Sequence, residues 1–163
     1  MREAEIIEYV EGLGEVVALR PAPGDGTPEI AWGDTFFYYS PDGSVPQGQP
    51  FATVVTKDYP DDERSRLDRD GAFRVNVAAG REAFEQALGH RPGEPPPSDA
   101  DPGEDDALLP HPVYGGLAWV AVVNPGPRTE GRLRDLLRTA HSLARARHER
   151  RAGTAGRPGP HTA

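Results

Sequence analysis

Several residue types are scarce in this chain of 163 residues, and each scarcity excludes a class of protein or site. Cysteine is absent, so the chain can form no disulfide and offers no thiolate to a metal. No stretch approaches the roughly 20 apolar residues of a membrane-spanning helix. The acidic N-terminus, MREAEIIEYVEG, lacks the apolar core of a signal peptide. We therefore expect a cytoplasmic protein that has no contact with a membrane.

Positive charge is also scarce. Lysine and arginine together number 18 against 26 aspartates and glutamates, which gives a formal net charge of −8. Because non-specific nucleic-acid binding depends on neutralising phosphates with basic side chains, this balance argues against a nucleic-acid partner. The simplest interpretation of the acidity is solubility. The only lysine is Lys57, and the abundance of arginine, alanine, glycine and proline is typical of a GC-rich genome.

What the chain does contain is a series of strand-like runs, most of them between Glu29 and Asn124. Apolar and polar residues alternate along these runs, as they do along half-buried strands. The predicted strands are Val16–Leu19, Ile30–Trp32 with Thr35–Tyr39, Phe51–Lys57, Phe73–Val77 and Ala118–Val123. Turns or short loops join neighbouring runs, and the SPDGS turn is one example. Such connections favour antiparallel pairing.

Three segments have the period of a helix: Glu3–Leu13, Arg81–Leu88 and a final helix from Thr129. The final helix has the clearest apolar stripe, formed by Leu133, Leu136, Leu137, Ala140, Leu143 and Ala144. We predict an α+β fold, with a single mostly antiparallel sheet and helices packed on one face.

Two segments have the composition of disordered chain. Residues 91–106, RPGEPPPSDADPGEDD, combine prolines that prevent a helix with carboxylates that repel one another, which predicts a solvated loop. Residues 150–163 predict a disordered tail. The remainder, residues 1–149, is expected to be a single domain.

Alternation also nominates a candidate site. Arg74 and Asn76 share one face of their strand, opposite the apolar residues on either side of them. If the strand that ends at Lys57 lies beside it, these polar groups could meet on the face away from the helices. Trp32, Tyr38 and Trp119 would then supply an apolar wall. Such a patch could hold an anionic or planar ligand, and the alternative is an ordinary solvated face with cross-strand charge pairs.

His111 precedes Pro112, Val113 and Tyr114, and histidine titrates in the range that acid–base catalysis requires. The alternative is a histidine that braces a loop. No HxH or HExxH motif, phosphate-binding glycine loop or GxSxG motif occurs, so we predict no metal and no cofactor.

Three functions stay open at this point. The first is a non-enzymatic binding module for an unknown small molecule or protein. The second is an enzyme that uses His111 as acid–base beside Lys57 or Tyr114. The third is a protein-interaction module that uses the acidic loop or the arginine-rich end of the last helix. The candidate ligand-binding residues are Lys57, Arg74, Asn76, His111, Tyr114, Trp32, Tyr38 and Trp119.

Four blocks of the chain resemble a known family: EIAWGDTFFYYSPDG, PFATVVTKDYP, FRVNVAAGREAF and LLPHPVYGGLAWVAVVNPG. Together they resemble an uncharacterised actinobacterial family known only as a domain of unknown function, over roughly Glu5 to Ala144. The order of elements is more remotely similar to the MmcQ/YjbR-like family, in which Lys57 and Trp119 would match a strand-end lysine and a tryptophan of the last strand. That likeness implies a compact α+β fold and a nucleic-acid role, with which the acidic charge conflicts.

Overall fold

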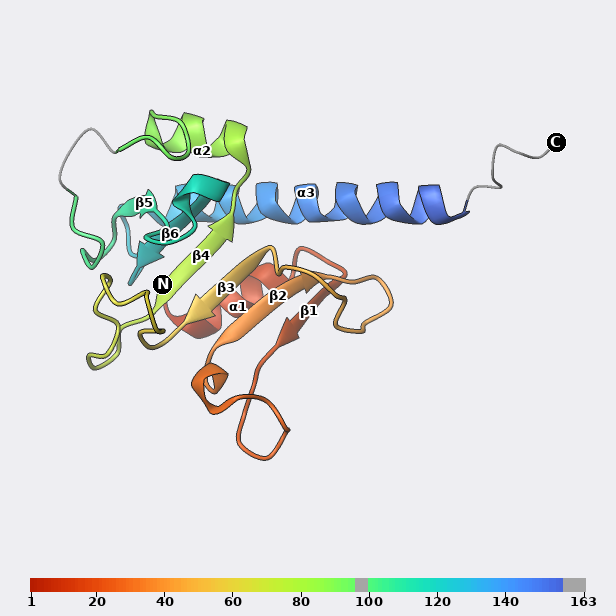
Figure 1. The fold of residues 1–163 in the computed structure, drawn as a ribbon, viewed down its shortest axis with the longest axis horizontal. Helices are drawn as coiled ribbons and strands as arrows, with labels where there is room; N and C mark the ends of the chain where they lie inside the picture. Colours follow the sequence, from red (N-terminus) through yellow and green to blue (C-terminus); the bar gives the residue numbers. More distant parts are fainter. Residues whose placement is uncertain (96–99, 157–163) are drawn as a thin grey trace.

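A six-stranded antiparallel sheet forms one layer of the protein, and helices cover one of its faces (Figure 1). The computed structural model describes residues 1–95 and 100–156. The strands lie in the order β1-β2-β3-β4-β6-β5, so that β6 is inserted between β4 and β5. Their bounds are β1 Val16–Leu19, β2 Thr35–Tyr39, β3 Ala52–Val55, β4 Arg74–Ala78, β5 Leu108–Pro110 and β6 Trp119–Val123. The predicted fold class is confirmed.

Three α-helices accompany the sheet: α1 Glu3–Glu11, α2 Arg81–Leu88 and α3 Glu130–Gly156. Two short 3-10 helices, η1 Glu29–Ala31 and η2 Gly115–Leu117, lie in the connections. The first turn of α2 follows Gly80, whose φ of 82° favours glycine; a Cβ there would also come within 2.8 Å of Leu143 on α3.

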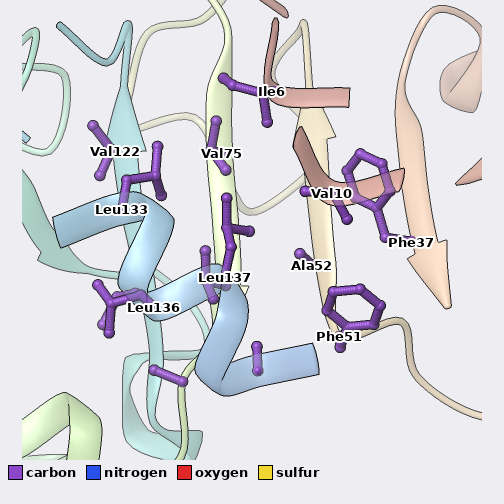
Figure 2. Packing of buried hydrophobic residues seen from close by; sticks show 14 of the residues in the cluster. Ile6, Val10, Phe37, Phe51, Ala52, Val75, Val122, Leu133, Leu136 and Leu137 are labelled. Carbon is purple, nitrogen blue, oxygen red and sulfur yellow. The ribbon is translucent and has the colours of Figure 1, made fainter. Parts of the chain in front are cut away.

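The core lies between the sheet and the helices, and it follows from the two periodicities in the sequence (Figure 2). Alternate strand residues such as Val75 and Val122 point toward the helices, where Ile6 and Leu137 meet them from α1 and α3. Each of these side chains is at most 1% exposed. Full burial of one such side chain contributes about 1.5–3 kcal/mol.

The prediction of a strand at Ile30–Trp32 is wrong. Residues Glu29–Ala31 form a 3-10 turn instead, in which the amides of Ala31 and Trp32 donate to the carbonyls of Pro28 and Glu29. Ile30 is 40% exposed, so its apolar side chain does not mark a buried strand position. Gly33, with φ of 88°, then redirects the chain into β2.

The strand β5 went unpredicted, because three residues between an acidic segment and a proline are too short for a periodic pattern. The end of residues 91–106 is also not a free solvated loop. Asp101 pairs with Arg66 at 2.8 Å, and Asp105 pairs with Arg69 at 3.3 Å. Residues 96–99 of that loop lie outside the described part of the chain.

The last helix is longer than expected. It continues to Gly156, although the predicted tail begins at residue 150. Figure 1 shows this end of α3 extending past the sheet. Residues 157–163 of the predicted tail lie outside the described residues.

Asp106 connects the acidic segment to the start of α3. Its carboxylate accepts hydrogen bonds from the amides of Gly126 (2.8 Å), Arg128 (2.9 Å) and Thr129 (3.0 Å), and from the Thr129 hydroxyl (2.6 Å). These bonds lower the pKa of the carboxyl group against the opposing effect of its desolvation. An acceptor at a helix start stabilises a protein by about 0.5–2 kcal/mol.

We therefore expect Asp106→Ala to lower the free energy of unfolding by about 2 kcal/mol, at the upper end of the range for a lost cap. Urea denaturation followed by circular dichroism measures this. Glu104→Ala is the matched control, since it removes an exposed carboxylate of the same segment. A change no larger in Asp106→Ala than in Glu104→Ala would contradict the capping role.

Candidate functional site

Arg74 and Asn76 lie on the face of the sheet opposite the helices, which we call the open face. Strand pairing aligns Thr53, Asn76 and Ala121 in one row across this face. A neighbouring row contains Val55, Arg74 and Val123. The predicted position of Arg74 and Asn76 on a common face, away from Val75 and Val77, agrees with this register.

Arg74 is the centre of a buried polar network, and the residue is only 2% exposed. Its two terminal nitrogens donate to both carboxylate oxygens of Asp62, at 3.0 and 2.6 Å. Its Nε donates to Asn76 Oδ1 at 2.7 Å, and Nη1 also donates to Ser65 Oγ at 2.9 Å. Asn76 in turn donates to Thr53 Oγ1 at 3.0 Å. The guanidinium is thus held by residues of β4 and of the segment between β3 and β4, and it is not available to a ligand.

His111 completes this network from the end of β5. Its Nδ1 accepts hydrogen bonds from the amides of Val113 and Tyr114, each at 3.0 Å. Because neutral imidazole has one acceptor nitrogen, these bonds assign the proton to Nε2. Nε2 lies 3.1 Å from Arg74 Nη2, which can only donate, and 3.9 Å from Asp62 Oδ2, which is too far for a direct hydrogen bond.

Burial lowers the pKa of His111 to about 3, and the adjacent positive charge of Arg74 acts in the same direction. The histidine is 5% exposed and is neutral at pH 7. Asp62 has a lowered pKa despite its desolvation, because Arg74 bonds to its charged form. A histidine with these properties does not exchange protons with a substrate at neutral pH, and the geometry instead supports the alternative in which it braces a loop.

The loop that His111 braces carries exposed apolar side chains. The rings of His111 and Tyr114 lie 4.8 Å apart between centroids, and Trp119 lies 6.4 Å from each. Tyr114 is 50% exposed, and Leu117 is 74% exposed. Exposed apolar side chains that gather on one loop are typical of a surface that contacts a partner or a ligand.

A groove of about 670 Å³ lies beside this loop. Arg81 at the start of α2 and Arg91 after its end line it. Within the described residues, 1–95 and 100–156, each forms one exposed local ion pair, with Glu85 at 3.6 Å and with Glu94 at 3.0 Å. The other lining residues are Gly80, Pro92, Glu94, Gly116, Leu117 and Ala118. The groove therefore combines two cationic groups from different segments with an exposed leucine.

Lys57 lies in a different cluster, at the end of the sheet where β2 begins and β3 ends. Its Nζ contacts Asp34 Oδ1 at 2.9 Å and donates to the Trp32 carbonyl at 2.8 Å. The Tyr59 hydroxyl also donates to Asp34, and burial together with this bond raises the pKa of Tyr59. Lys57 is 27% exposed at its side chain, while Asp34 is buried. This cluster holds a strand end together.

The structure thus brings some of the predicted residues together and separates others. Five form one connected group: Arg74, Asn76, His111, Tyr114 and Trp119. Lys57 and Trp32 meet each other in the Asp34 cluster. Tyr38 lies on β2 opposite Val17, in a partly exposed part of the open face.

Sequence reasoning missed the acidic partners of both clusters. A buried arginine requires a carboxylate, so Arg74 itself indicates that one must exist. The segment between β3 and β4 offers six acidic residues, and local pattern does not select Asp62 among them. The turn in which Tyr59 pairs with Asp62 determines which carboxylate is used. It directs Tyr59 toward Asp34 and Asp62 toward Arg74.

Comparison with known proteins gives one match. The sequence model of a family of unknown function, DUF6194, matches residues 1–153. The chain belongs to this family. The resemblance to an uncharacterised family is therefore confirmed. The family match covers the whole sheet, α1, α2 and α3 as far as residue 153. No curated protein and no solved structure matches the chain significantly.

Among residues 1–95 and 100–156, no helix has the length and apolar character needed to cross a bilayer. Within the same ranges, no group of three or more histidine, aspartate or glutamate side chains is arranged as a metal site.

Proposed function

We propose that this protein is a non-catalytic binding module for a small anionic ligand with an apolar part. The site is the groove beside the loop that contains η2, together with the aromatic side chains next to it on the open face. Tyr114, Trp119 and Leu117 would contact the apolar part, and Arg81 and Arg91 would contact the anion.

The observation that carries this proposal is the rigid support beneath an exposed apolar loop. Arg74, Asp62 and His111 form a buried network that holds the loop by the amides of Val113 and Tyr114. Binding sites need their contact residues fixed by a supporting shell of packed and hydrogen-bonded side chains. Holding Tyr114 in an exposed position is useful to a protein that presents it to a ligand.

The groove supports the same reading through its size and charge. Its volume of about 670 Å³ is within the range of small-molecule sites. Two arginines and one glutamate, Glu94, line the groove, and this excess of positive charge in a chain of net charge −8 favours an anionic group there.

The predicted candidates then have different roles. Arg74, Asn76 and His111 are positioning residues, since they are buried and already paired. Tyr114 and Trp119 are contact residues. We assign the three others, Lys57, Trp32 and Tyr38, to the same open face outside the groove, where they would extend the surface available to a larger ligand.

The experiment is a thermal-shift screen, followed by calorimetry with the ligands that raise the melting temperature. The panel contains aliphatic and aromatic carboxylates, acyl phosphates, nucleotides and, for comparison, neutral sugars. A ligand at about 100 times its dissociation constant stabilises the folded protein by about 2.7 kcal/mol. We expect an amphipathic anion to raise the melting temperature and the neutral sugars to leave it unchanged.

Variants then locate the site. Arg91→Gln and Leu117→Ser should each weaken binding by about tenfold, which corresponds to about 1.4 kcal/mol. The matched control is Arg145→Gln, because Arg145 is an equally exposed arginine with a local glutamate partner on α3. Equal loss in the control, or no stabilising anion in the panel, would overturn the proposal.

Three finer expectations remain predictions beside this proposal. They are a cytoplasmic location, the absence of a nucleic-acid partner and the remote likeness to the MmcQ/YjbR-like family. The observed order of helix, antiparallel sheet and closing helix is compatible with that likeness.

A further inference from the structure

The strand β1 forms one edge of the sheet, and half of its backbone hydrogen-bonding groups point away from β2. The amide of Ser40 donates to the carbonyl of Glu15, which identifies these two as a hydrogen-bonded pair of the ladder. Because such pairs alternate along antiparallel strands, Val17 and Leu19 also bond to β2. Val16 and Ala18 therefore direct their N–H and C=O groups away from β2. Figure 1 shows that β1 is the edge strand on this side of the sheet.

Apart from its short length of four residues, this edge lacks the features that keep strand edges apart in most proteins. Natural edges carry charges, prolines or bulges within the strand. The sequence of β1 is Val-Val-Ala-Leu, its four residues are all partly exposed, and its pairing with β2 is regular along its length. An apolar and regular edge of this kind is suited to accept another strand.

We propose that a second copy of this chain pairs with β1, antiparallel and about a two-fold axis at Val17. In this register Val16 of one copy lies opposite Ala18 of the other. Both residues direct their backbone groups outward, so each such pair exchanges two hydrogen bonds. A two-fold axis makes the contact self-complementary and closed, and it joins both sheets into one.

Side chains on the open face fit the same axis. Val17 lies opposite Tyr38 within one copy, and in the pair it lies opposite its own equivalent. The result is a continuous apolar row, Tyr38–Val17–Val17–Tyr38, in place of two partly exposed ends. Cross-strand apolar pairs of this kind contribute about 0.2–1 kcal/mol each.

Charge at the ends of β1 favours a copy of the same chain over an unrelated extended peptide. Arg20, just after β1, is exposed and forms no ion pair within 4 Å among the described residues. The proposed register places it opposite Gly14 of the second copy, directly beside Glu15. The two-fold axis repeats this arrangement, so each end of the contact brings one arginine next to one glutamate.

Sedimentation velocity over about 10 μM to 1 mM protein tests the proposal, since this range brackets weak self-association. We expect a dimer that forms with rising concentration. Ala18→Pro should give a monomer at every concentration, because proline removes the outward N–H and its ring blocks pairing. Proline is tolerated at an edge position whose N–H makes no bond in the sheet, so the monomer should keep its circular dichroism. Ala18→Ser is the control that should still dimerise.

Hydrogen exchange supplies a second measurement at the same residues. The amides of Val16 and Ala18 should exchange more slowly at high protein concentration, while those of Ala18→Ser should behave as in the parent chain. A chain that stays monomeric up to about 1 mM would overturn the proposal. So would a dimer that Ala18→Pro leaves intact, or β1 amides that become protected only by an unrelated extended peptide.

Discussion

Arg74→Met should lower the free energy of unfolding by about 3–5 kcal/mol, the cost of removing one partner from a buried ion pair. The substitution leaves the carboxylate of Asp62, in the segment between β3 and β4, without its two guanidinium bonds. It also removes the donors that Asn76 and Ser65 face. Guanidinium chloride denaturation at pH 7 measures the change, with the slope of the transition as the check on two-state behaviour.

Two controls separate the buried pair from a general effect of losing an arginine. Arg66→Met removes an exposed arginine that pairs with Asp101, and it should cost at most about 1 kcal/mol. The double variant Arg74→Met with Asp62→Leu should recover part of the loss, since it leaves no buried charge unpaired. A single variant as mild as Arg66→Met, or a double variant worse than the sum of its parts, would refute the role given to this pair.

Acid should destabilise the protein steeply between about pH 6.5 and pH 3, and His111 should cause much of this loss. The pKa of His111 is about 3 in the folded protein, whereas an unfolded histidine has a pKa of about 6.5. Between these values the unfolded chain binds a proton that the folded chain does not. Stability is therefore complete above about pH 6.5 and falls by up to about 1.4 kcal/mol per pH unit below it.

Burial and most of the charges around His111 lower its pKa, as this pH dependence requires. Arg74 and Arg64 disfavour its protonated form, and Asp62 favours it without overcoming burial. Asp62 adds a second loss at lower pH. Its own folded pKa is lowered, so its contribution is present above the unfolded value and disappears as pH falls through the folded one.

His111→Phe tests the assignment, since it keeps a ring in the same place and cannot titrate. Its free energy of unfolding, measured in urea from pH 7 to pH 4, should vary less with pH than that of the parent chain. His90→Phe is the control, because His90 follows the end of α2 and is not part of the Arg74 network, and this variant should retain the parent's pH dependence. An identical slope in the parent and in His111→Phe would show that other groups cause the acid loss.

The local sequence pattern predicted the fold more completely than it predicted the candidate site. The alternation in residues 73–77 predicts a strand with Arg74 on one side and Val75 on the other, and the structure agrees. The helical stripe of α3 likewise predicts the buried Leu133 and Leu137. Both signals repeat over several residues. The 3-10 turn at Glu29–Ala31 and the three residues of β5 are too short to show a period, so the sequence pattern did not predict them.

The candidate site was predicted as a set of residue types on one face, and only part of that set meets. Arg74, Asn76 and His111 do meet, but as buried and paired groups. Lys57 was expected beside them and instead pairs with Asp34. The prediction considered which face a side chain occupies, and it had no information on which carboxylate would reach that face.

The sequence by itself determined the class of fold, the antiparallel pairing, the membership of the core and the face on which Arg74 lies. These depend on periods of about two and 3.6 residues, which are properties of neighbouring positions. Only the tertiary structure decided that Asp62 and His111 enclose Arg74, that Leu117 stands beside a groove with Arg81 and Arg91, and that β1 is a bare edge. These depend on contacts between residues far apart in the chain, which burial, charge pairing and strand order select together.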